Sequence, residues 1–503
     1  MVGAKPVWAV HKFGGTSLAD ADCYRHAANI LSTDKRRLAV VVSAQGKLKD
    51  KAGNTVYDKV TSLLIECARL AAARDPSYEN VLRAVINRSV ETAEQLLGES
   101  DQRSKIVEQL HADADDLRYV LKNAWLSKTA DTKTCPWWTG YGEIWSARLM
   151  AAYLRQAADC RSVQWLDARD VITVSTRRPG HTVPLLDRSR ESWQTWLQAH
   201  EECDLVVITG FICSTENGVP YTLGRDGSDH SASIMAALIS ADELTIWSDV
   251  DGVYSADPNI VDRAVIRSKV SYKEAMELAY FGAKVLHPKT MTPLVGTEIP
   301  IRIRNTFKPE SPGSTILPSR IENAPRIQGF STILDLMLIN VEGCGMVGVP
   351  GIASRLFGAM HVIGCSVMLV TQAGSEHSIC FALPMNEASA ALAGIEKEFR
   401  DELESKEIQT IDTFGPCACL AAVGDGMRFR SNIAGSVLSS LGKAKINIRA
   451  ISQGASERNI SVVIDQEDVV EALNAVHEEF IELDINGYDQ ENHCNDRLPK
   501  EEK

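Results

Sequence analysis

Two glycine-rich segments of this 503-residue chain carry residue types that bind phosphate and carboxylate groups. In segment 11–17 (HKFGGTS), Lys12, two glycines and two hydroxyls follow an apolar run. Such glycines let the backbone approach an anion, and N–H groups at the start of the next helix point at it. The segment does not match the GxxxxGKS/T phosphate loop. The plain alternative is a tight strand–helix turn with a surface lysine. On the functional interpretation, we expect Lys12→Ala to abolish turnover with little loss of fold, because a surface-loop lysine contributes little to stability.

The second glycine-rich segment, 222–229 (TLGRDGSD), also precedes an expected helix. Arg225 could hold a carboxylate through two parallel hydrogen bonds. Asp229 could accept hydrogen bonds from an ammonium group, or it could simply cap a helix that begins at Ser231. Capping alone leaves the arginine and the two glycines unexplained.

Three further segments carry candidate ligand-binding residues. Segment 248–258 (SDVDGVYSADP) ends an expected strand, and ligands of open α/β sheets bind at the carboxyl ends of strands. Segment 281–288 (FGAKVLHP) adds Lys284. Glu143 stands at the head of a long helix, where its simplest role is to complement the helix dipole. No Ser/His/Asp set, Cys/His set or metal-ligand spacing stands out.

Alternating strands and helices must position these segments over the first 320 residues. We expect strands at 7–13, 38–43, 204–211, 243–250 and 299–305, and helices at 60–74, 80–97, 142–158, 231–240 and 272–281. Short apolar strands between helices predict an α/β fold whose mostly parallel sheet has helices on both faces. The charged segment 101–122 predicts a solvated helix. The prolines and glycine of 308–320 predict an inter-domain linker.

The last third of the chain contains an internal repeat. Residues 372–379 (QAGSEHSI) match residues 453–460 (QGASERNI), 81 positions later. Each copy has the order of strands and helices of a ferredoxin-like βαββαβ module. Segment 343–348 (GCGMVG) also fits the dinucleotide pattern GxGxxG. However, Phe429 replaces the third glycine in the second copy, and Gln372 stands where a ribose-binding acid is expected.

Composition narrows the class of protein. The chain has 53 basic and 66 acidic residues, and this net charge of −13 argues against nucleic acid or an anionic membrane as main partner. No apolar run approaches the ~18 residues of a membrane span. Twelve scattered cysteines without a CxxC pair exclude a zinc ribbon or a secreted disulfide framework. With a strand-like run at 7–13 in place of a signal peptide, we expect a cytoplasmic protein.

Taken together, the strings KFGGTS, TLGRDGSD, WSDVDGVYSADP and FGAKVLHP, followed by the tandem modules, resemble aspartate kinases of the amino-acid kinase family with C-terminal ACT modules. The resemblance runs from about Val7 to about Phe480. The repeats are most similar to those in the kinase half of bifunctional aspartate kinase–homoserine dehydrogenases, whose dehydrogenase half would need several hundred further residues. We expect a catalytic domain at 1–320, ACT modules at 321–410 and 411–486 that can exchange their last strand, and a polar tail at 487–503.

The resemblance implies three groups of site residues, with Lys12 and Asp229 as the catalytic pair. The nucleotide would be held by Lys12, Gly14, Gly15, Thr16, Ser17, Ser248, Asp249, Tyr254 and Lys284. Aspartate would be held by Ser43, Thr61, Glu143, Phe211, Arg225, Ser228 and Asp229. In that set Glu143 and Asp229 receive the α-ammonium group and Arg225 the α-carboxylate. A feedback amino acid would be held by Gln372, Ser375, Glu376, Gln453, Ser456 and Glu457.

The implied reaction is transfer of a phosphoryl group from ATP to the β-carboxylate of L-aspartate, the first step of lysine, threonine and methionine biosynthesis. A carboxylate with a pKa of ~4 is ionised at neutral pH and needs no general base. Catalysis would then consist of positioning and charge stabilisation. Mg²⁺ needs few protein ligands, so no metal motif is expected. The resemblance also implies a homodimer inhibited by an amino acid, with threonine as the first candidate and lysine as the second.

Three departures from the family pattern keep alternatives open. Asn259 follows the Asp-Pro pair where arginine is usual, Ser248 replaces the commoner threonine, and residues 47–59 lengthen the loop after Ser43. The first and third are the only support for a catalytically inactive amino-acid sensor. Other amino-acid kinases, acting on glutamate, acetylglutamate or uridylate, share the expected fold. A nicotinamide-dependent enzyme rests on the GxGxxG segment alone.

Overall fold

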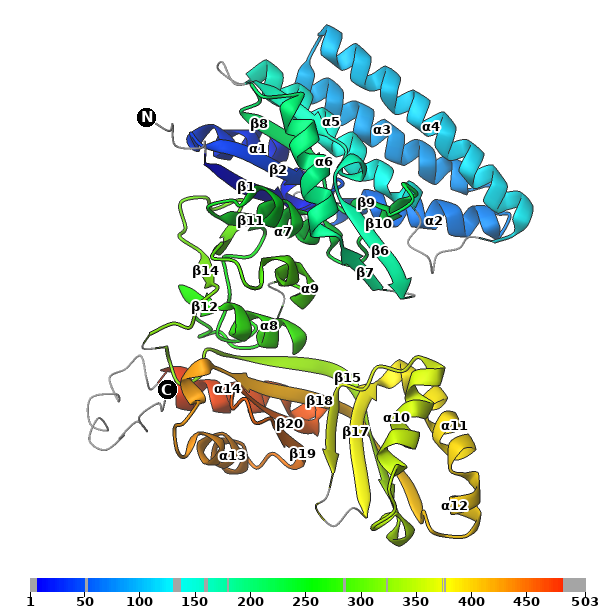
Figure 1. Ribbon diagram of the computed structural model, residues 1–503, viewed down its shortest axis with the longest axis vertical. Coiled ribbons are helices and arrows are strands. Elements are labelled where there is room, and N and C mark those ends of the chain that lie inside the picture. Colours follow the sequence, from blue (N-terminus) through cyan, green and yellow to red (C-terminus); the bar gives the residue numbers. More distant parts are fainter. Residues whose placement is uncertain are drawn as a thin grey trace. The chain divides into compact units, whose positions relative to one another are not determined.

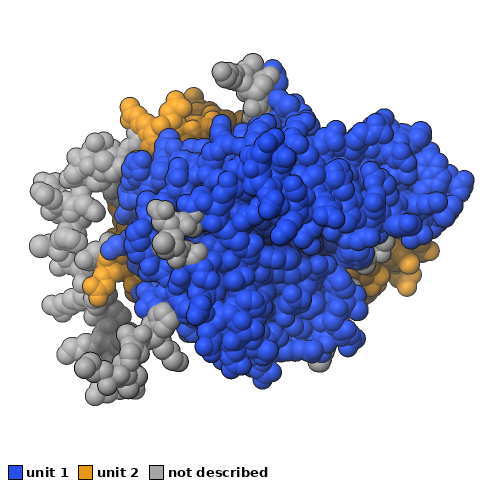
Figure 2. All heavy atoms as spheres, turned by 90° about the horizontal axis from the view of Figure 1, so that it is seen from above, with its two compact units in different colours: residues 1–253, 268–272, 285–319 blue, residues 254–267, 273–284, 320–503 orange. Residues whose placement is uncertain are grey.

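The computed structural model describes residues 7–49, 53–129, 137–157, 162–178, 181–283, 286–322, 324–372, 374 and 377–482. The chain forms two compact units, which Figure 2 shows in different colours. Unit 1 comprises residues 1–253, 268–272 and 285–319, and unit 2 comprises residues 254–267, 273–284 and 320–503. Among the described residues, no helix is long and apolar enough to cross a membrane.

The main sheet of unit 1 confirms the predicted α/β class. Its described strands run, in spatial order, β12 (Lys269–Ser271), β14 (Ser314–Leu317), β13 (Ile301–Asn305), β11 (Leu244–Ser248), β1 (Trp8–Phe13), β2 (Arg37–Val42), β8 (Leu205–Thr209) and β5 (Val163–Leu166). All neighbours are parallel except β13 and β14. The central strands are buried, as expected for a sheet covered on both faces.

Helices surround this sheet. They are α1 (Ala21–Thr33), α2 (Val60–Ala72), α3 (Tyr78–Leu97), α4 (Asp101–Ser127), α5 (Tyr141–Ala157), α6 (Leu186–Gln198), α7 (Gly227–Ile239) and the short α9 (Pro288–Met291). Figure 1 shows α3, α4 and α5 side by side. The prediction of a solvated helix at 101–122 is wrong for one face of α4. A buried stripe on this face consists of Ile106, Leu110, Leu117 and Leu121. The sequence-based prediction missed this stripe because charged residues outnumber these apolar residues in the segment.

Smaller sheets interrupt the alternation of strands and helices. One consists of β10 (Pro220–Thr222), β9 (Ile212–Thr215), β6 (Thr173–Arg178) and β7 (His181–Pro184), and β3 (Leu48–Lys49) pairs with β4 (Thr55–Tyr57) in the long loop after Ser43. The predicted linker 308–320 contains β14, which lies within the main sheet. Gly313 explains the return into the sheet: its φ is +65°, and a Cβ there would lie 2.0 Å from the carbonyl oxygen of Ile303.

Unit 2 is built on one antiparallel sheet. Its described strands run in the order β16 (Leu369–Gln372), β17 (Ser378–Pro384), β15 (Gly329–Glu342), β18 (Thr410–Val423), β20 (Asn459–Asp465) and β19 (Ile448–Gln453). Its helices are α8 (Tyr272–Tyr280), α10 (Ile352–Ile363), α11 (Ala388–Glu398), α12 (Arg400–Glu404), α13 (Ile433–Lys443) and α14 (Val469–His477). The two copies of the repeat follow the predicted ferredoxin-like order.

The long strands β15 and β18 lie side by side and join the two copies (Figure 1). Residues 338–342 of β15 pair with 410–414 of β18, whereas residues 329–333 pair with 419–423. Phe330, near the start of β15, packs in the core of the second copy with Leu420 and Phe480. Each copy therefore completes its sheet with a strand segment contributed from outside its own stretch of sequence.

The GxGxxG segment has a packing explanation. A Cβ on Gly343 would lie 2.2 Å from the carbonyl oxygen of Glu407, and one on Gly345 would lie 2.4 Å from the Cβ of Glu407. These glycines make room for the segment around Glu407 rather than for a dinucleotide. The strands around them are antiparallel, unlike those of a dinucleotide-binding fold.

Candidate active site

Four adjacent parallel strands of unit 1 end at the same edge of the sheet. In the registers of β11, β1, β2 and β8, Phe13 lies beside Trp247 and Val42, and Val42 lies beside Thr209. The segments that follow these strands therefore emerge together, as ligand-binding segments of open α/β sheets do. They begin with Gly14, Ser43, Gly210 and Asp249, and Ser248 is the last residue of β11.

Lys12 and Asp229 form an ion pair at this edge. The Nζ of Lys12 lies 2.6 Å from Oδ1 of Asp229. Lys12 is only 7% exposed, because it belongs to the central strand β1. The prediction that Lys12 lies on the surface is therefore wrong. Because buried Lys12 contacts the half-buried carboxylate of Asp229, substitution of either residue leaves the other without this partner.

The segments after β1 and β2 touch each other at two glycines. The N–H group of Gly46 donates to the carbonyl of Gly15 at 2.9 Å, and a Cβ on Gly46 would lie 2.3 Å from the carbonyl carbon of Gly15. The predicted Gly14 donates its N–H to the carbonyl of Trp247 at 3.1 Å. Our sequence analysis missed Gly46; the only signal was a glycine shortly after an apolar strand.

The two hydroxyl residues of this loop have different surroundings. Thr16 is exposed at the start of a short 3₁₀ helix. Ser17 is fully buried, and its hydroxyl lies 2.6 Å from that of Thr306. The Ser17 side chain is therefore already hydrogen-bonded within the protein.

Glu143 occupies the first turn of α5 and is 2% exposed. Burial raises the pKa of its carboxyl group to about 7, although the charge of Lys59 and hydrogen bonds from the backbone of Ala44 and Glu143 itself act in the opposite direction. Among the described residues, Oε2 of Glu143 has no hydrogen-bond partner. A buried carboxylate oxygen without a donor is costly, and a bound cation would compensate for it.

The start of α7 packs closely against the loop after β8. A Cβ on Gly210 would lie 2.7 Å from the Cβ of Ser228, so this position requires a glycine. Phe211 has a φ of +68°, and its N–H group donates to Oγ of Ser231 at 3.0 Å. The helix begins at Gly227 and not at Ser231 as predicted. Asp229 thus lies inside its first turn, where it contacts Lys12 instead of capping the helix.

The remaining predicted aspartate ligands differ in exposure. The Arg225 side chain is 88% exposed, with Nε 3.7 Å from Oδ2 of Asp226. Ser43 is buried, and its N–H group donates to the carbonyl of Phe13 at 3.2 Å. The hydroxyl of Thr61 is buried and has no partner among the described residues. Among the described residues, no hydrogen bond or ion pair therefore joins the side chains of Arg225, Ser43 and Thr61 to one another.

The predicted nucleotide segment divides between the two units. In unit 1, Ser248 ends β11 and its Oγ accepts from the N–H group of Val250 at 3.4 Å, while Asp249 is exposed. Tyr254 belongs to unit 2, where it pairs with Ile266. Lys284 lies outside the described residues.

Asn259, the departure after the Asp-Pro pair, also lies in unit 2. Its Nδ2 donates to Oδ1 of Asp257 at 2.8 Å, and its backbone N–H group donates to the same oxygen at 2.9 Å. The shorter amide side chain therefore closes a local turn.

A pocket of about 340 Å³ lies in the second copy of the repeat. It is lined by Met427, Phe429, Arg430, Ser431, Asn432, Ile433, Ala434, Gly435, Gln453, Glu457 and Ile460. Two of these residues were predicted effector ligands. Oε2 of Glu457 accepts a hydrogen bond from the N–H group of Phe429 at 2.8 Å. Ser456 is exposed in the turn after β19 and is not part of the lining.

Arg430 and Asn432 were not predicted from the sequence, because the first copy has Val349 and Gly351 at the equivalent positions and the repeat gave no signal there. In the first copy, Gln372 ends β16 just as Gln453 ends β19. Ser375 and Glu376 lie outside the described residues.

Comparisons with known proteins agree with this architecture. Residues 8–305 match the amino acid kinase family, and residues 339–399 and 420–480 match the ACT domain. The chain is 40% identical over 481 residues to the chloroplastic bifunctional aspartokinase/homoserine dehydrogenase 2 of Arabidopsis thaliana. That alignment covers 94% of this chain but 51% of the plant protein, so the chain spans about half the length of this relative.

Two solved structures of E. coli aspartokinase III resemble the chain at 27% identity. The structure with aspartate and ADP has a TM-score of 0.75, and the one with lysine and aspartate has a TM-score of 0.71. Each match covers 94% of this chain and 99% of the other. The matched kinase segment includes all four strand ends described above, and it makes up more than half of the chain. The chain therefore belongs to the amino acid kinase family and carries two ACT domains.

Proposed function

We propose that the protein is an aspartate kinase, which phosphorylates the β-carboxylate of L-aspartate with Mg-ATP to give 4-phospho-L-aspartate. The observation that carries this proposal is the contact between buried Lys12 and Asp229 at the sheet edge. The similarity to E. coli aspartokinase III, solved with aspartate and ADP, supports the same ligands here. The product would begin lysine, threonine and methionine biosynthesis.

In the part of the site that binds aspartate, acidic side chains would bind the α-ammonium group and an arginine would bind the α-carboxylate. The open oxygen of buried Glu143, together with Asp229, suits the α-ammonium group. Arg225 is exposed and unhindered, which suits a side chain that turns toward an α-carboxylate on binding. Ser43, Thr61, Phe211 and Ser228 would complete the pocket.

The phosphate end would use Lys12 and the glycine loop. The lysine charge would stabilise the transferring phosphoryl group, while N–H groups of Gly15 and Thr16 bind phosphate oxygens. Ser248, Asp249, Tyr254 and Lys284 are proposed to hold the rest of the nucleotide, with Gly14 and Ser17 shaping the loop. Aspartate supplies an ionised nucleophile, so no residue is assigned as general base.

The residues present are compatible with Mg²⁺ that arrives with ATP. Among the described residues, no group of three or more His, Cys, Asp or Glu side chains could hold a metal by itself. Mg²⁺ at phosphate sites keeps several waters and takes one or two carboxylates, for which Asp229 and Asp249 are candidates. When bound, the ion neutralises phosphate charge.

Regulation is proposed to act through the ACT domains. An amino acid in the pocket around Gln453 and Glu457, and in the corresponding place near Gln372, would favour a less active state. Threonine is proposed before lysine, and a homodimer is proposed as the assembly. We also retain as proposals the domain limits 1–320, 321–410 and 411–486, with a tail at 487–503, and a cytoplasmic location.

The proposal is tested by incubating the protein with L-aspartate and Mg-ATP and trapping the acyl phosphate as the hydroxamate. Glutamate and acetylglutamate serve as alternative acceptors, and each reaction is repeated with threonine or lysine. We expect hydroxamate from aspartate alone, suppressed by one of the two amino acids. A folded protein that binds ADP but yields no acyl phosphate from any acceptor would instead be an amino-acid sensor.

A further inference from the structure

Helix α3 carries a buried polar face beneath the candidate site. Arg88, Ser89 and Thr92 are all less than 9% exposed, and Arg88 is only 2% exposed. Burial of a guanidinium group costs free energy, and an apolar side chain of similar size would avoid that cost. The position of Arg88 therefore calls for an explanation from what it contacts.

Arg88 binds three separate segments of unit 1 through their backbones. Its Nη2 donates to the carbonyl of Ala19 at 2.8 Å and to that of Gly46 at 2.6 Å, and its Nη1 donates to the carbonyl of Asp58 at 2.9 Å. All three acceptors are uncharged backbone carbonyl groups. The planar guanidinium thus serves as a fixed three-way connector rather than as half of an ion pair.

Each connected segment carries proposed ligands. The segment with Ala19 follows Gly15 and Thr16. The segment with Gly46 follows Ser43, and the segment with Asp58 precedes Thr61. The first two segments meet where Gly46 donates to Gly15, so that Arg88 binds directly behind this crossing.

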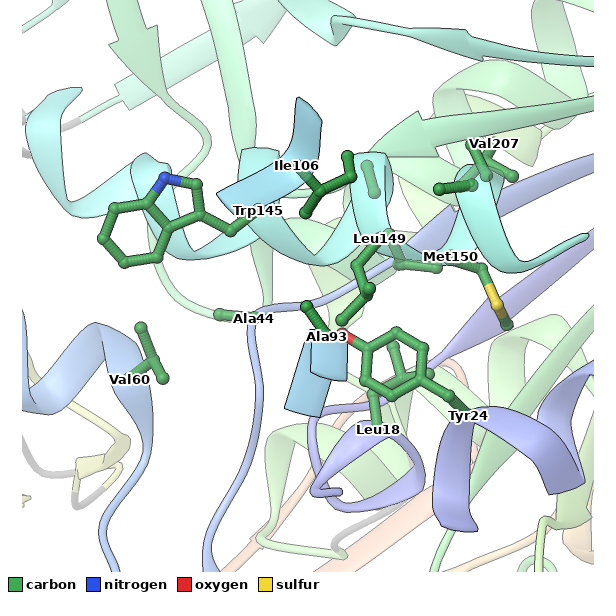
Figure 3. Close-up of a cluster of buried hydrophobic side chains, with 14 of the residues drawn as sticks. Leu18, Tyr24, Ala44, Val60, Ala93, Ile106, Trp145, Leu149, Met150 and Val207 are labelled. Atoms are coloured by element: carbon green, nitrogen blue, oxygen red, sulfur yellow. The ribbon is translucent and has the colours of Figure 1, made fainter. Parts of the chain in front are cut away.

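Neighbouring contacts reinforce the connection. Gln45 donates from Nε2 to the hydroxyl of Thr92 at 3.0 Å, and its Oε1 accepts from that of Ser89 at 3.3 Å. The backbone carbonyl of Gln45 accepts from the N–H group of Val60 at 3.0 Å. The three segments also share apolar contacts, since Figure 3 shows Leu18, Ala44 and Val60 in one buried cluster.

We propose that Arg88 is a positioning residue for the kinase reaction, because it sets the distance between the phosphate-binding glycine loop and the two segments that hold aspartate. This inference rests on the proposed function. The apolar cluster in Figure 3 holds the segments together, but apolar contacts alone leave their carbonyls free to shift. Phosphoryl transfer needs donor and acceptor in line, and a misplacement of about 1 Å can cost about 100-fold in rate.

The test compares Arg88→Lys and Arg88→Met with the matched pair Arg83→Lys and Arg83→Met. Arg83 lies on the same helix but is exposed. An ammonium group cannot reproduce the planar fork, so we expect Arg88→Lys to lower kcat by about 10- to 100-fold and to weaken Mg-ADP binding several-fold. Its thermal midpoint should remain within a few degrees of the parent, and both Arg83 variants should match the parent in every measurement.

Two readouts keep this inference separate from the proposed function. If the parent protein makes no acyl phosphate, the proposed function fails, and titration with Mg-ADP still decides the role of Arg88. An Arg88→Lys protein with parental kcat and parental ADP affinity overturns the inference, whatever its thermal midpoint. If Arg88→Met does not fold, Arg88→Lys alone gives the answer.

Discussion

The sheet edge of unit 1 and the pocket of unit 2 both lie at the start of a helix, but their charged side chains differ in burial. At the sheet edge, Lys12 and Glu143 are almost completely buried, and one oxygen of Glu143 has no donor among the residues that the structure describes. In the pocket, Glu457 is partly exposed and already accepts a backbone hydrogen bond. Buried charge is costly and suits a site where a ligand must be activated, whereas exposed polar groups are sufficient to bind an effector.

The two copies of the repeat sharpen this contrast within unit 2. Gly348 and Gly351 of the first copy have positive φ angles, and so do their equivalents Phe429 and Asn432 in the second. A side chain in the left-handed region costs roughly 1 kcal/mol or more, which glycine avoids. The second copy therefore tolerates strain to place side chains in its pocket, and we infer that the two copies have diverged in what they bind.

Among the substitutions at the sheet edge, removal of Lys12 should have the largest effect on activity. We expect Lys12→Ala to lower kcat by at least about 1000-fold, because it removes the charge assigned to the phosphoryl group. It should also lower the thermal midpoint by a few degrees, since Asp229 loses its partner. The hydroxamate assay and a thermal melt measure both effects, with exposed Lys35→Ala as control. Near-normal turnover would refute the role of Lys12.

Glu143→Gln should raise the KM for aspartate about 100-fold at pH 8, since a neutral amide cannot pair with the ammonium group. The pKa of about 7 predicts that the parental KM rises as pH falls below 7, whereas the KM of the variant stays level. This pKa lies above the ordinary value, so the folded protein retains the proton and the parent loses stability as pH rises from about 4.5 to 7.

Kinetics and thermal melts between pH 5 and 8 check both parts of the Glu143 prediction. The thermal midpoint of the parent should fall more steeply with rising pH than that of the variant. The same pH dependence of the KM for aspartate in parent and variant would contradict the assignment.

Arg225 tests the exposed part of the same site. Arg225→Ala should raise the KM for aspartate by about tenfold through loss of a charge-assisted hydrogen bond, with kcat within a few-fold of the parent. The thermal midpoint should not change, because the side chain is 88% exposed. Exposed Arg188→Ala on α6 is the matched control. A change confined to the KM for ATP would show that Arg225 belongs to the nucleotide end.

The smallest expected effect concerns the pocket of unit 2. Gln453→Ala should raise the half-inhibitory effector concentration about fivefold, the size of one neutral hydrogen bond, without changing uninhibited kcat. Gln372→Ala in the first copy should have a weaker effect if the copies have diverged. Equal shifts in both variants would remove the distinction between the copies, and no shift in either would mean that the pocket does not bind the effector.

Much of this architecture could be predicted because the signals are local. The apolar runs around β1, β2, β8, β11 and β13 were located to within a few residues, and the repeat 81 residues apart revealed two modules. The errors arose where distant contacts decide the structure. A strand inside the predicted linker, the early start of α7 and the buried stripe of α4 all depend on partners that are far away in sequence.

The residue types and their order along the chain already specify which groups are available for chemistry: a lysine beside paired glycines, an arginine before a helix, and a repeated module with a glutamine at a strand end. Three features depend on the folded chain: Lys12 is buried and contacts Asp229, one oxygen of Glu143 has no donor in the described part of the chain, and Gly15 contacts Gly46, whose carbonyl binds Arg88. The physical reason is that burial and hydrogen-bond satisfaction depend on groups brought together from distant segments, and they set the charge and position of each side chain.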